Sequence, residues 1–226
     1  MDIIARIYND YTDKFGIPRQ GRLADKVESR IEFEKEYRNP DAIRGMDGFS
    51  HLWLIWEFSE NKDAGWSPTV RPPRLGGNKR MGVFATRSPF RPNPIGLSCV
   101  KIERIDLECK NAPVIYVTGA DILNGTPIYD IKPYLAYTDS VPDASGGFAE
   151  EFTDFKIDVI CDEKYLAVIP KDKRPGLMQI LSQDPRPAYQ QDDSRIYGFL
   201  YGDYEIKFTV KDNILTVTNI TKQPVR

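Results

Sequence analysis

Short segments in which apolar and polar residues alternate predict β-strands along the first two thirds of the chain. The clearest are residues 3–8, 49–58, 95–105 and 114–123, which are rich in β-branched and aromatic side chains. The next four residues, Asn-Gly-Thr-Pro at 124–127, predict a turn, since Asn and Gly accept positive φ and Pro resists continuation of a strand. Helical patterns are few here, so we expect a mostly antiparallel sheet that closes into a barrel.

Three further segments have weaker patterns. Residues 27–37 alternate apolar positions with Glu and Arg, and predict either a strand or a short helix. Residues 41–48 resemble a single helical turn, and residues 81–86 form a short strand-like run inside a loop. These segments connect the stronger strands and leave the barrel as the main architecture.

The pattern changes at residues 142–147, where a cluster of turn-forming residues predicts a domain boundary. The elements beyond it are a strand at 152–160, a helix opened by Pro at 175–183, and a hairpin of strands 204–210 and 214–220. We therefore expect a mostly β protein, with a small antiparallel β-barrel domain at 1–144 followed by a small α+β domain at 145–226. A domain of about 80 residues buries little apolar surface alone, so it should pack against the barrel.

The composition is that of a soluble globular protein, with 226 residues of which 41% are hydrophobic and 28% are charged. No apolar run approaches the roughly 18 residues of a membrane-spanning helix. The N-terminus carries acidic residues where a signal peptide is basic. We therefore expect a cytoplasmic protein without a membrane contact.

Histidine and cysteine usage limits the possible chemistry. Cys99, Cys109 and Cys161 lack the C-x-x-C spacing of zinc sites, and His51 is the only histidine. We expect no metal site, and a structural or pocket-lining role for His51 is favoured over that of a general base. The glycine-rich signatures of Rossmann dinucleotide sites and P-loops are missing from the sequence, so an enzyme here must bind its cofactor in another way.

One stretch of the chain differs from the rest in charge. Residues 71–101 contain seven Lys or Arg and no Asp or Glu, although the whole chain holds 31 basic and 33 acidic residues. Many Pro and Gly residues stiffen this basic segment, and a rigid basic surface suits a polyanion such as RNA. The alternative is a solvated charged loop. The candidate RNA-binding residues are Arg71, Arg74, Lys79, Arg80 and Arg91, with Arg186 near the C-terminus as a further candidate.

Three loops contain residues whose role the composition leaves open. Residues 121–134 end a strand in a turn with polar groups and free amides, which fits a small-molecule site or an ordinary turn. Residues 18–20 form a loop with a solvent-facing Arg. Residues 184–189, held extended by two prolines, either present Arg186 and Tyr189 to a partner or only end the preceding helix.

The same segments resemble a known family. GVFATRSPFRPNPIGLS at 82–98, with GWSPTVRPPRLGGNKRM before it and DILNGTPIYDIKPYL after it, closely resembles the TsaA/TrmO family of S-adenosylmethionine-dependent tRNA methyltransferases. FGIPRQ and SQDPRPAY match the same family, so the resemblance spans nearly the whole chain. The last motif is typical of bacterial members with an added C-terminal domain.

The resemblance implies a small β-barrel methyltransferase, unlike the Rossmann enzymes, with S-adenosylmethionine as its cofactor. It implies methylation of the exocyclic nitrogen of threonylcarbamoyladenosine beside the anticodon of a threonine tRNA, with the anticodon stem-loop held by the basic segment. It also implies a cofactor pocket that a homodimer partner completes. By motif, the cofactor contacts are Pro18, Arg19, Gln20, Ser59, Glu60, Arg87, Leu97, Leu123, Asn124, Gly125 and Thr126.

Methyl transfer from a sulfonium is an in-line displacement, so alignment of the reacting atoms is the main requirement. The attacking nitrogen must also lose its proton, and Asp130 and Asp121 are the candidate acceptors by location, with an ordered water as the alternative. Backbone amides of the 124–126 turn are expected to hold the cofactor.

Two other functions fit the fold. One is methylation of a small metabolite, which is disfavoured because a small substrate needs neither the basic segment nor an added domain. The other is RNA binding without catalysis, which the intact central motif disfavours.

Overall fold

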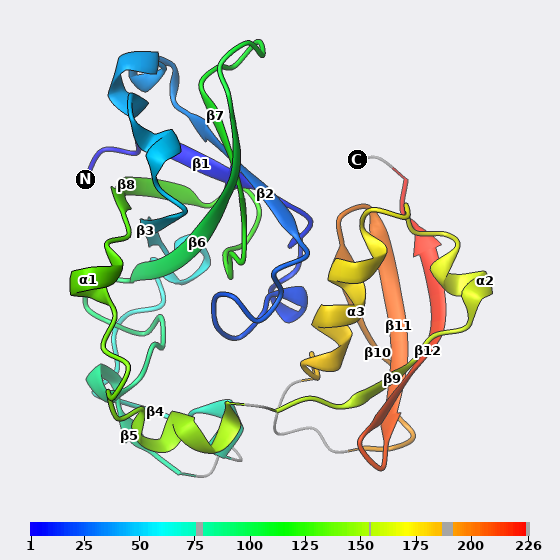
Figure 1. Cartoon of the computed structure of the whole chain (residues 1–226). Helices are drawn as coiled ribbons and strands as arrows, with labels where there is room; N and C mark the ends of the chain where they lie inside the picture. The colour runs from blue at the N-terminus through cyan, green and yellow to red at the C-terminus, as the bar shows by residue number, and fades with distance from the viewer. Residues whose placement is uncertain (76–78, 154, 187–191, 225–226) are drawn as a thin grey trace.

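The structure, a computed structural model, describes residues 1–75, 79–153, 155–186 and 192–224. For Arg74 it describes the backbone alone. Strands make up most of its regular structure, which confirms the expectation of a mostly β protein. Figure 1 shows two parts that lie side by side. One part is a six-stranded barrel, and the other is a four-stranded sheet with a helix against it.

The barrel closes through antiparallel pairs in the strand order β1-β2-β7-β6-β3-β8. Its strands are β1 (Ala5–Tyr8), β2 (Glu28–Phe33), β3 (His51–Glu57), β6 (Ile95–Asp106), β7 (Val114–Thr118) and β8 (Pro127–Pro133). Alternate side chains point inward, so Leu52, Leu54 and Trp56 of β3 are buried in one core with Ile31 and Val117. Burial of this inner face selects the strand register, because a shift by one residue would expose every one of these side chains.

Short 3-10 turns and a two-stranded ribbon connect the barrel strands. Two of the turns have side-chain caps, in which Asp13 accepts from the amide of Phe15 and Asn39 accepts from the amide of Asp41. The connecting elements are η1 (Lys14–Gly16), η2 (Lys35–Tyr37), η3 (Pro40–Ile43), η4 (Met46–Gly48), η5 (Ser59–Asn61), β4 (Thr69–Val70), η6 (Pro73–Leu75), β5 (Met81–Gly82) and η7 (Val83–Ala85). The short helix α1 (Ala136–Asp139) and the 3-10 turn η8 (Gly147–Phe152) follow the last barrel strand and lead to the C-terminal part. The basic segment is therefore mostly loop until β6 begins.

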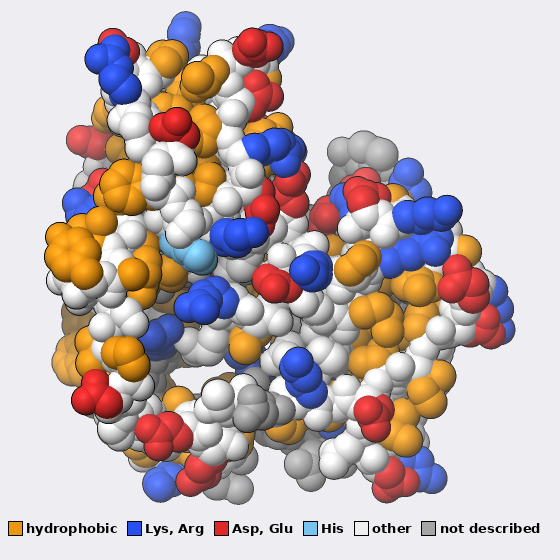
Figure 2. Space-filling model, viewed as in Figure 1, with side chains coloured by type: hydrophobic (Ala, Val, Ile, Leu, Met, Phe, Trp, Pro, Cys, Tyr) orange, Lys and Arg blue, Asp and Glu red, His pale blue; other side chains and the backbone are white. Residues whose placement is uncertain are grey.

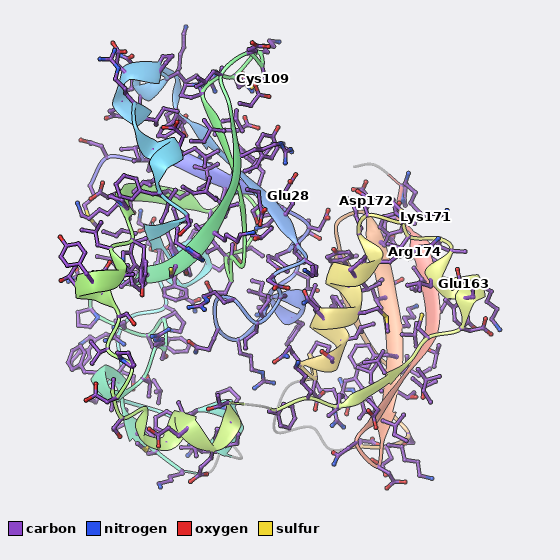
Figure 3. All side chains as sticks on the ribbon, viewed as in Figure 1. Glu28, Cys109, Glu163, Lys171, Asp172 and Arg174 are labelled. Atoms are coloured by element: carbon purple, nitrogen blue, oxygen red, sulfur yellow. The ribbon has the colours of Figure 1, made fainter. Side chains whose placement is uncertain are left out.

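The C-terminal sheet has the strand order β10-β11-β12-β9, and β9 runs parallel to β12 while the other pairs are antiparallel. Its strands are β9 (Asp158–Ile160), β10 (Tyr197–Tyr201), β11 (Tyr204–Lys211) and β12 (Ile214–Lys222). Asp212 and Asn213 take positive φ in the turn between β11 and β12, which confirms the predicted hairpin. Arg174 at the start of α3 (Arg174–Ser182) pairs with Glu163 of α2 (Glu163–Leu166), and Figure 3 labels both side chains.

The two parts of the molecule share a hydrophobic core. Tyr11 and Val27 belong to the chain between β1 and β2, yet they are buried together with Leu177 of α3 and Tyr201 of β10. The expected packing of the C-terminal part against the barrel is thus present. The domain limits 1–144 and 145–226 stay a prediction.

Backbone geometry explains one wrong strand end and one strand that the sequence pattern misses. The strand predicted at 114–123 ends at Thr118, because Gly119 takes a φ of 80° and turns the chain. The sequence pattern does not predict β8, because Pro127 is expected to stop a strand. Pro127 instead occupies the first position of β8, where a missing N–H is tolerated.

The other differences are in length. The strands predicted at 81–86 and 152–160 are shorter than expected and span only Met81–Gly82 and Asp158–Ile160. The 3-10 turns η7 and η8 occupy part of the remaining residues. Residues 27–37 form β2 followed by η2, and β10 is a strand that the sequence pattern does not predict. Within the described ranges, no helix is long and apolar enough to cross a lipid bilayer.

Candidate functional site

A pocket of about 560 Å³ opens where several loops meet the ends of barrel strands, and we call it the barrel pocket. Four stretches of chain line it: the loop after η1, the end of β3 with η5, the end of the basic segment with the start of β6, and the loop between β7 and β8. Nine of the eleven positions expected to contact the cofactor lie here: Pro18, Arg19, Gln20, Ser59, Glu60, Arg87, Leu97, Leu123 and Thr126. The fold therefore brings together residues that are far apart in the sequence.

Three side chains form a hydrogen-bonded row at the barrel pocket, and the first and last of them, Trp56 and Asp121, line it. The indole N–H of Trp56 donates to the Ser98 hydroxyl at 3.0 Å, and this hydroxyl donates to Oδ1 of Asp121 at 2.5 Å. The direction of both bonds is fixed, because an indole N–H only donates and the single hydroxyl hydrogen is left for the carboxylate. Trp56 and Ser98 occupy inward positions of β3 and β6, and the turn at Gly119 brings Asp121 to them.

Asp121 has the properties of a proton acceptor. Burial raises the pKa of Asp121 above its ordinary value, and the hydrogen bond from Ser98 and the charge of Arg87 offset part of this rise. A carboxylate with a raised pKa inside a pocket is a candidate general base. Asp130, the other expected acceptor, lies on β8 outside the barrel pocket, where it pairs with Lys132 at 2.7 Å.

The turn at 124–126 uses its backbone differently from what its sequence predicts. The amides of Asn124, Gly125 and Thr126 donate to the carbonyls of Tyr11, Ile7 and Leu123, at 2.8, 2.8 and 3.2 Å. All three amides are therefore satisfied within the protein, and the expectation of free amides at this turn is wrong. Asn124 and Gly125 do not line the barrel pocket, so their role as cofactor contacts stays a prediction.

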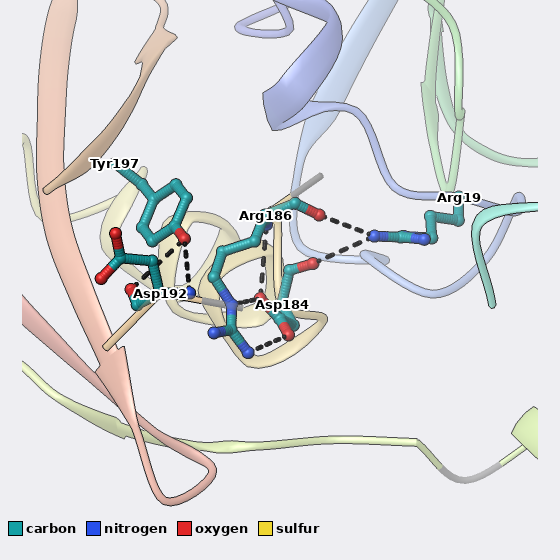
Figure 4. A network of polar contacts seen from close by, with 5 residues as sticks. All are labelled: Arg19, Asp184, Arg186, Asp192 and Tyr197. Atoms are coloured by element: carbon teal, nitrogen blue, oxygen red, sulfur yellow. Dashed lines mark hydrogen bonds and ion pairs between the residues drawn. The ribbon is translucent and has the colours of Figure 1, made fainter. Parts of the chain in front are cut away.

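Two neighbouring side chains of the loop after η1 point to different partners. Gln20 accepts a hydrogen bond from Nη1 of Arg87 at 2.8 Å, which joins this loop to the basic segment. Arg19 instead reaches the C-terminal part, where its Nη2 donates to the carbonyl oxygen of Arg186 at 2.9 Å (Figure 4). One loop of the barrel pocket is thus tied to both sides of the molecule.

A larger cleft of about 1460 Å³ adjoins the barrel pocket, and the side chains of Arg19, Gln20 and Arg87 line both. The barrel contributes one side of this cleft, and residues 183–186 of the C-terminal part contribute another. Figure 2 shows Lys and Arg side chains, with some Asp and Glu among them, on the face where the two parts meet. The charged residues that line the cleft are mostly basic: Lys14, Arg19, Arg71, Arg80, Arg87 and Arg186, with Asp184 as an acidic one. We call this space the basic cleft.

The barrel side of the basic cleft combines charge with aromatic rings. Arg71 and Arg80 line it together with Phe84 and Phe90, whose side chains are 70% and 40% exposed. These rings lie in one cleft beside charged side chains, and apolar surface bordered by polar groups is typical of a binding surface. Guanidinium groups beside aromatic faces suit the phosphates and unstacked bases of single-stranded RNA.

The other RNA-binding candidates have different surroundings. Lys79 is exposed and lies outside both pockets, and the side chain of Arg74 lies outside the described residues. Arg91 donates from Nη1 to the carbonyls of Val83 and Thr86 at 3.0 and 2.7 Å, so it holds the backbone of the basic segment. Arg186 pairs with Asp184. Their roles in RNA binding stay predictions.

His51 lies at the start of β3, outside both pockets, and its Nδ1 is 2.9 Å from the Ser50 hydroxyl. Burial lowers the pKa of His51, and the charges of Arg22 and Lys101 lower it further. These features fit the structural role rather than that of a general base. Among the residues that the structure describes, no three His, Cys, Asp or Glu side chains are grouped as a metal site would require.

Sequence reasoning does not identify Trp56 and Ser98 as parts of the site. A signal was available for Ser98, which stands between Gly96 and Val100 at an inward position of β6. A hydroxyl on the inner face of an apolar strand needs a partner, and here the partner is a carboxylate. Trp56 gives no such signal, because buried Trp is common in β cores.

The fold and the pocket together define the class of protein. A solved structure described as TrmO from Pseudomonas aeruginosa matches with a TM-score of 0.77 and 29% identity, over 97% of each chain. Another structure described as TrmO matches with a TM-score of 0.78 and the same identity. The barrel with its C-terminal sheet is therefore a TrmO-like fold.

Family comparisons agree with the fold. The model of the tRNA-methyltransferase O N-terminal domain matches residues 6–140, and that of the TrmO C-terminal domain matches residues 166–223. The chain belongs to the tRNA-methyltransferase O family, which confirms the resemblance to TsaA/TrmO proteins.

Three relatives are informative by name. The tRNA (adenine(37)-N6)-methyltransferase of Escherichia coli (strain K12) is 40% identical over 221 residues, which cover 92% of each chain. The enzyme of the same name from Eikenella corrodens is 46% identical and covers 75% of this chain and 95% of its own. A putative S-adenosylmethionine-dependent methyltransferase from Pseudomonas aeruginosa is 37% identical over 90% of this chain and 89% of its own.

Proposed function

We propose that this protein is a tRNA methyltransferase that transfers the methyl group of S-adenosylmethionine to the exocyclic nitrogen of threonylcarbamoyladenosine beside the anticodon. The observation that carries the proposal is the barrel pocket, which gathers nine of the eleven positions expected to contact the cofactor. The names of the relatives from Escherichia coli and Eikenella corrodens support the reaction and its position in the tRNA. A relative named as S-adenosylmethionine-dependent supports the cofactor.

The barrel pocket suits S-adenosylmethionine in size and chemistry. Its volume of about 560 Å³ lies in the usual range of small-molecule sites. Ile95 and Leu97 offer apolar surface for an adenine ring, and Arg87 offers a guanidinium for the amino-acid carboxylate.

When bound, S-adenosylmethionine supplies an electrophilic methyl group. We assign proton acceptance at the attacking nitrogen to Asp121, because its raised pKa makes it a stronger base than an exposed carboxylate. Ser98 holds the Asp121 carboxylate in place, and Trp56 holds Ser98. The remaining contribution of the protein is to align the reacting atoms and exclude water.

We assign the anticodon stem-loop to the basic cleft. Arg71 and Arg80 are available to phosphates, while Phe84 and Phe90 present ring faces to unpaired bases. The wall that this cleft shares with the barrel pocket gives the target nucleotide a short route to the methyl donor. A base already in a loop needs little energy to be presented.

A homodimer and a division into domains complete the proposal. Ile95 and Leu97 line the barrel pocket and are 38% and 56% exposed. A second copy packed over the pocket would cover the part of these side chains that the cofactor leaves exposed and would close the cofactor site. The two family matches support domains at 1–144 and 145–226. Modification of tRNA supports a cytoplasmic location.

The test is transfer of radiolabelled methyl from S-adenosylmethionine to tRNA that carries the threonylcarbamoyl group, beside tRNA that lacks it. We expect incorporation only into the modified tRNA. Incorporation into neither, with cofactor binding intact, would indicate a small-metabolite substrate. Loss of cofactor binding as well would indicate an RNA-binding protein without catalysis.

A further inference from the structure

Asp184 and Arg186 form a largely buried ion pair on the C-terminal side of the basic cleft (Figure 4). Nε and Nη2 of Arg186 each donate to one carboxylate oxygen of Asp184 at 2.9 Å, and the side chains are 13% and 16% exposed. The hydrogen bond to Asp184 raises the pKa of Arg186, so this guanidinium stays charged. Arg186 is thus engaged within its own segment rather than presented to phosphate.

The end of α3 sets the course of this segment. Asp184 has a φ of 53°, a left-handed conformation that Asp and Asn tolerate, and its amide donates to the Leu181 carbonyl at 3.2 Å. The carbonyl oxygens of Asp184 and Arg186 then accept hydrogen bonds from Nη2 of Arg19, at 3.5 and 2.9 Å. We call Arg19, Asp184 and Arg186 the Arg19 clasp.

Arg19 lies in the middle of a loop that both parts of the molecule hold. Before Arg19, Gly16 packs so closely on Phe199 of β10 that a Cβ would come within 2.7 Å of the ring. After Arg19, the amide of Arg22 donates to the carbonyl of Gly119 in the barrel at 2.8 Å. The C-terminal part therefore holds the start and the middle of this loop, and the barrel holds its end.

We propose that Asp184 and Arg186 are positioning residues for cofactor binding: through Arg19 they hold the loop after η1 in the conformation that lines the barrel pocket. Gln20 transmits the same constraint to Arg87, from which it accepts a hydrogen bond. Asp184 and Arg186 line the basic cleft but not the barrel pocket, so they act without touching the cofactor. The inference rests on the proposed function, because it takes the barrel pocket as the cofactor site.

The variant Asp184→Asn tests the Arg19 clasp in the full-length protein. Asn keeps the size of the side chain and tolerates the left-handed φ, but it leaves the Arg186 charge without its partner. We expect S-adenosylmethionine to bind about tenfold more weakly by calorimetry, which is the effect of losing one charged hydrogen bond. The KM for the cofactor should rise with little change in kcat. Because Asp184 acts through Arg19, combining Asp184→Asn with Arg19→Gln should weaken binding no further than Arg19→Gln alone.

The matched control is Lys173→Met, which removes a different ion pair between the two parts, that of Lys173 with Asp10 at 2.7 Å. Its cofactor affinity should equal that of the wild type. Equal weakening in both variants would mean that general loosening is the cause, and would overturn the proposal. Unchanged cofactor affinity in Asp184→Asn, with weaker RNA binding instead, would also overturn it and would restore Arg186 as an RNA contact.

Amide hydrogen exchange separates this inference from the proposed function. If the wild type binds no S-adenosylmethionine, the proposed function has failed, but the clasp still predicts how residues 17, 19 and 20 exchange. Their amides should exchange faster in Asp184→Asn than in the wild type and in Lys173→Met. Equal exchange in all three proteins would show that the clasp does not hold the loop.

Discussion

The indole of Trp56 lies against the backbone of Gly96, its partner across the β3–β6 pair. A Cβ at residue 96 would fall 2.2 Å from Cε2 of Trp56, far inside any allowed contact. Phe58 packs on the same indole with ring centroids 4.3 Å apart, and the indole N–H is bonded to Ser98. Glycine at residue 96 therefore makes room for the ring that holds the row of side chains leading to Asp121.

Gly96→Ala should displace Trp56 and thereby distort the barrel pocket. We expect a loss of about 1–3 kcal/mol in the free energy of unfolding, because the neighbouring ring has to move. Cofactor affinity should fall as well, since Trp56 and Gly96 both line the pocket. Urea unfolding and cofactor titration measure the two effects. The control is Gly48→Ala, where an added Cβ meets nothing within 4 Å, and equal results for both variants would contradict the packing argument.

Asp121→Asn should change the pH dependence of stability. Burial raises the pKa of Asp121 above its ordinary value of 3.8, so the folded protein binds this proton more tightly than the unfolded chain. The contribution of Asp121 to wild-type stability therefore decreases as pH rises from the ordinary pKa to the raised one, and is constant above it. The Asn variant lacks this loss, so its stability relative to the wild type should increase through that window. Thermal unfolding as a function of pH measures this difference, and a constant difference would contradict a raised pKa.

The part of the fold that the sequence predicts well is the part in which one face of a strand is buried. Residues 51–57 alternate strictly between buried and half-buried, and the hairpin around Asp212 and Asn213 has both alternation and turn chemistry. β8 lacks these signals, since it begins with Pro127 and ends in exposed polar residues. Its pairing with β1 and β3 closes the barrel, and such long-range pairing has no local pattern.

The candidate site was predictable only where a motif spans it. Family motifs identify the loops that line the barrel pocket, whereas the row from Trp56 to Asp121 joins residues 42 and 23 positions apart. Such distances leave no periodic pattern in a sequence. The same reason hides the Arg19 clasp, since the acceptors of Arg19 are backbone carbonyls, which every residue has.

Ser98→Ala should move the pH profile of methyl transfer. The hydrogen bond from Ser98 lowers the pKa of Asp121 and opposes the effect of burial. Without it the pKa rises further, so the acidic limb of the kcat profile should shift to higher pH while the plateau remains. Measuring kcat from pH 5 to 9 at saturating cofactor gives this shift. If the profile does not move, Asp121 is not the proton acceptor.

Arg87→Ala should weaken cofactor binding by about tenfold or more. The variant removes the guanidinium expected to meet the cofactor carboxylate, and it also removes the donor that holds Gln20. Calorimetric titration with S-adenosylmethionine checks the expectation. Arg80→Ala is the matched control, because Arg80 lines the basic cleft but not the barrel pocket. Equal affinities in wild type and Arg87→Ala would exclude Arg87 from the cofactor site.

Arg71→Ala and Phe84→Leu should weaken RNA binding in ways that salt distinguishes. Arg71 is exposed in the basic cleft, so its removal should reduce the slope of log affinity against log salt by about one. Phe84 offers a ring rather than a charge, so Phe84→Leu should lower affinity about tenfold at every salt concentration. Fluorescence anisotropy with a labelled anticodon stem-loop, at several salt concentrations, measures both. The same salt slope in Arg71→Ala and in wild type would show that phosphates bind elsewhere, and unchanged affinity in Phe84→Leu would show that no base stacks on this ring.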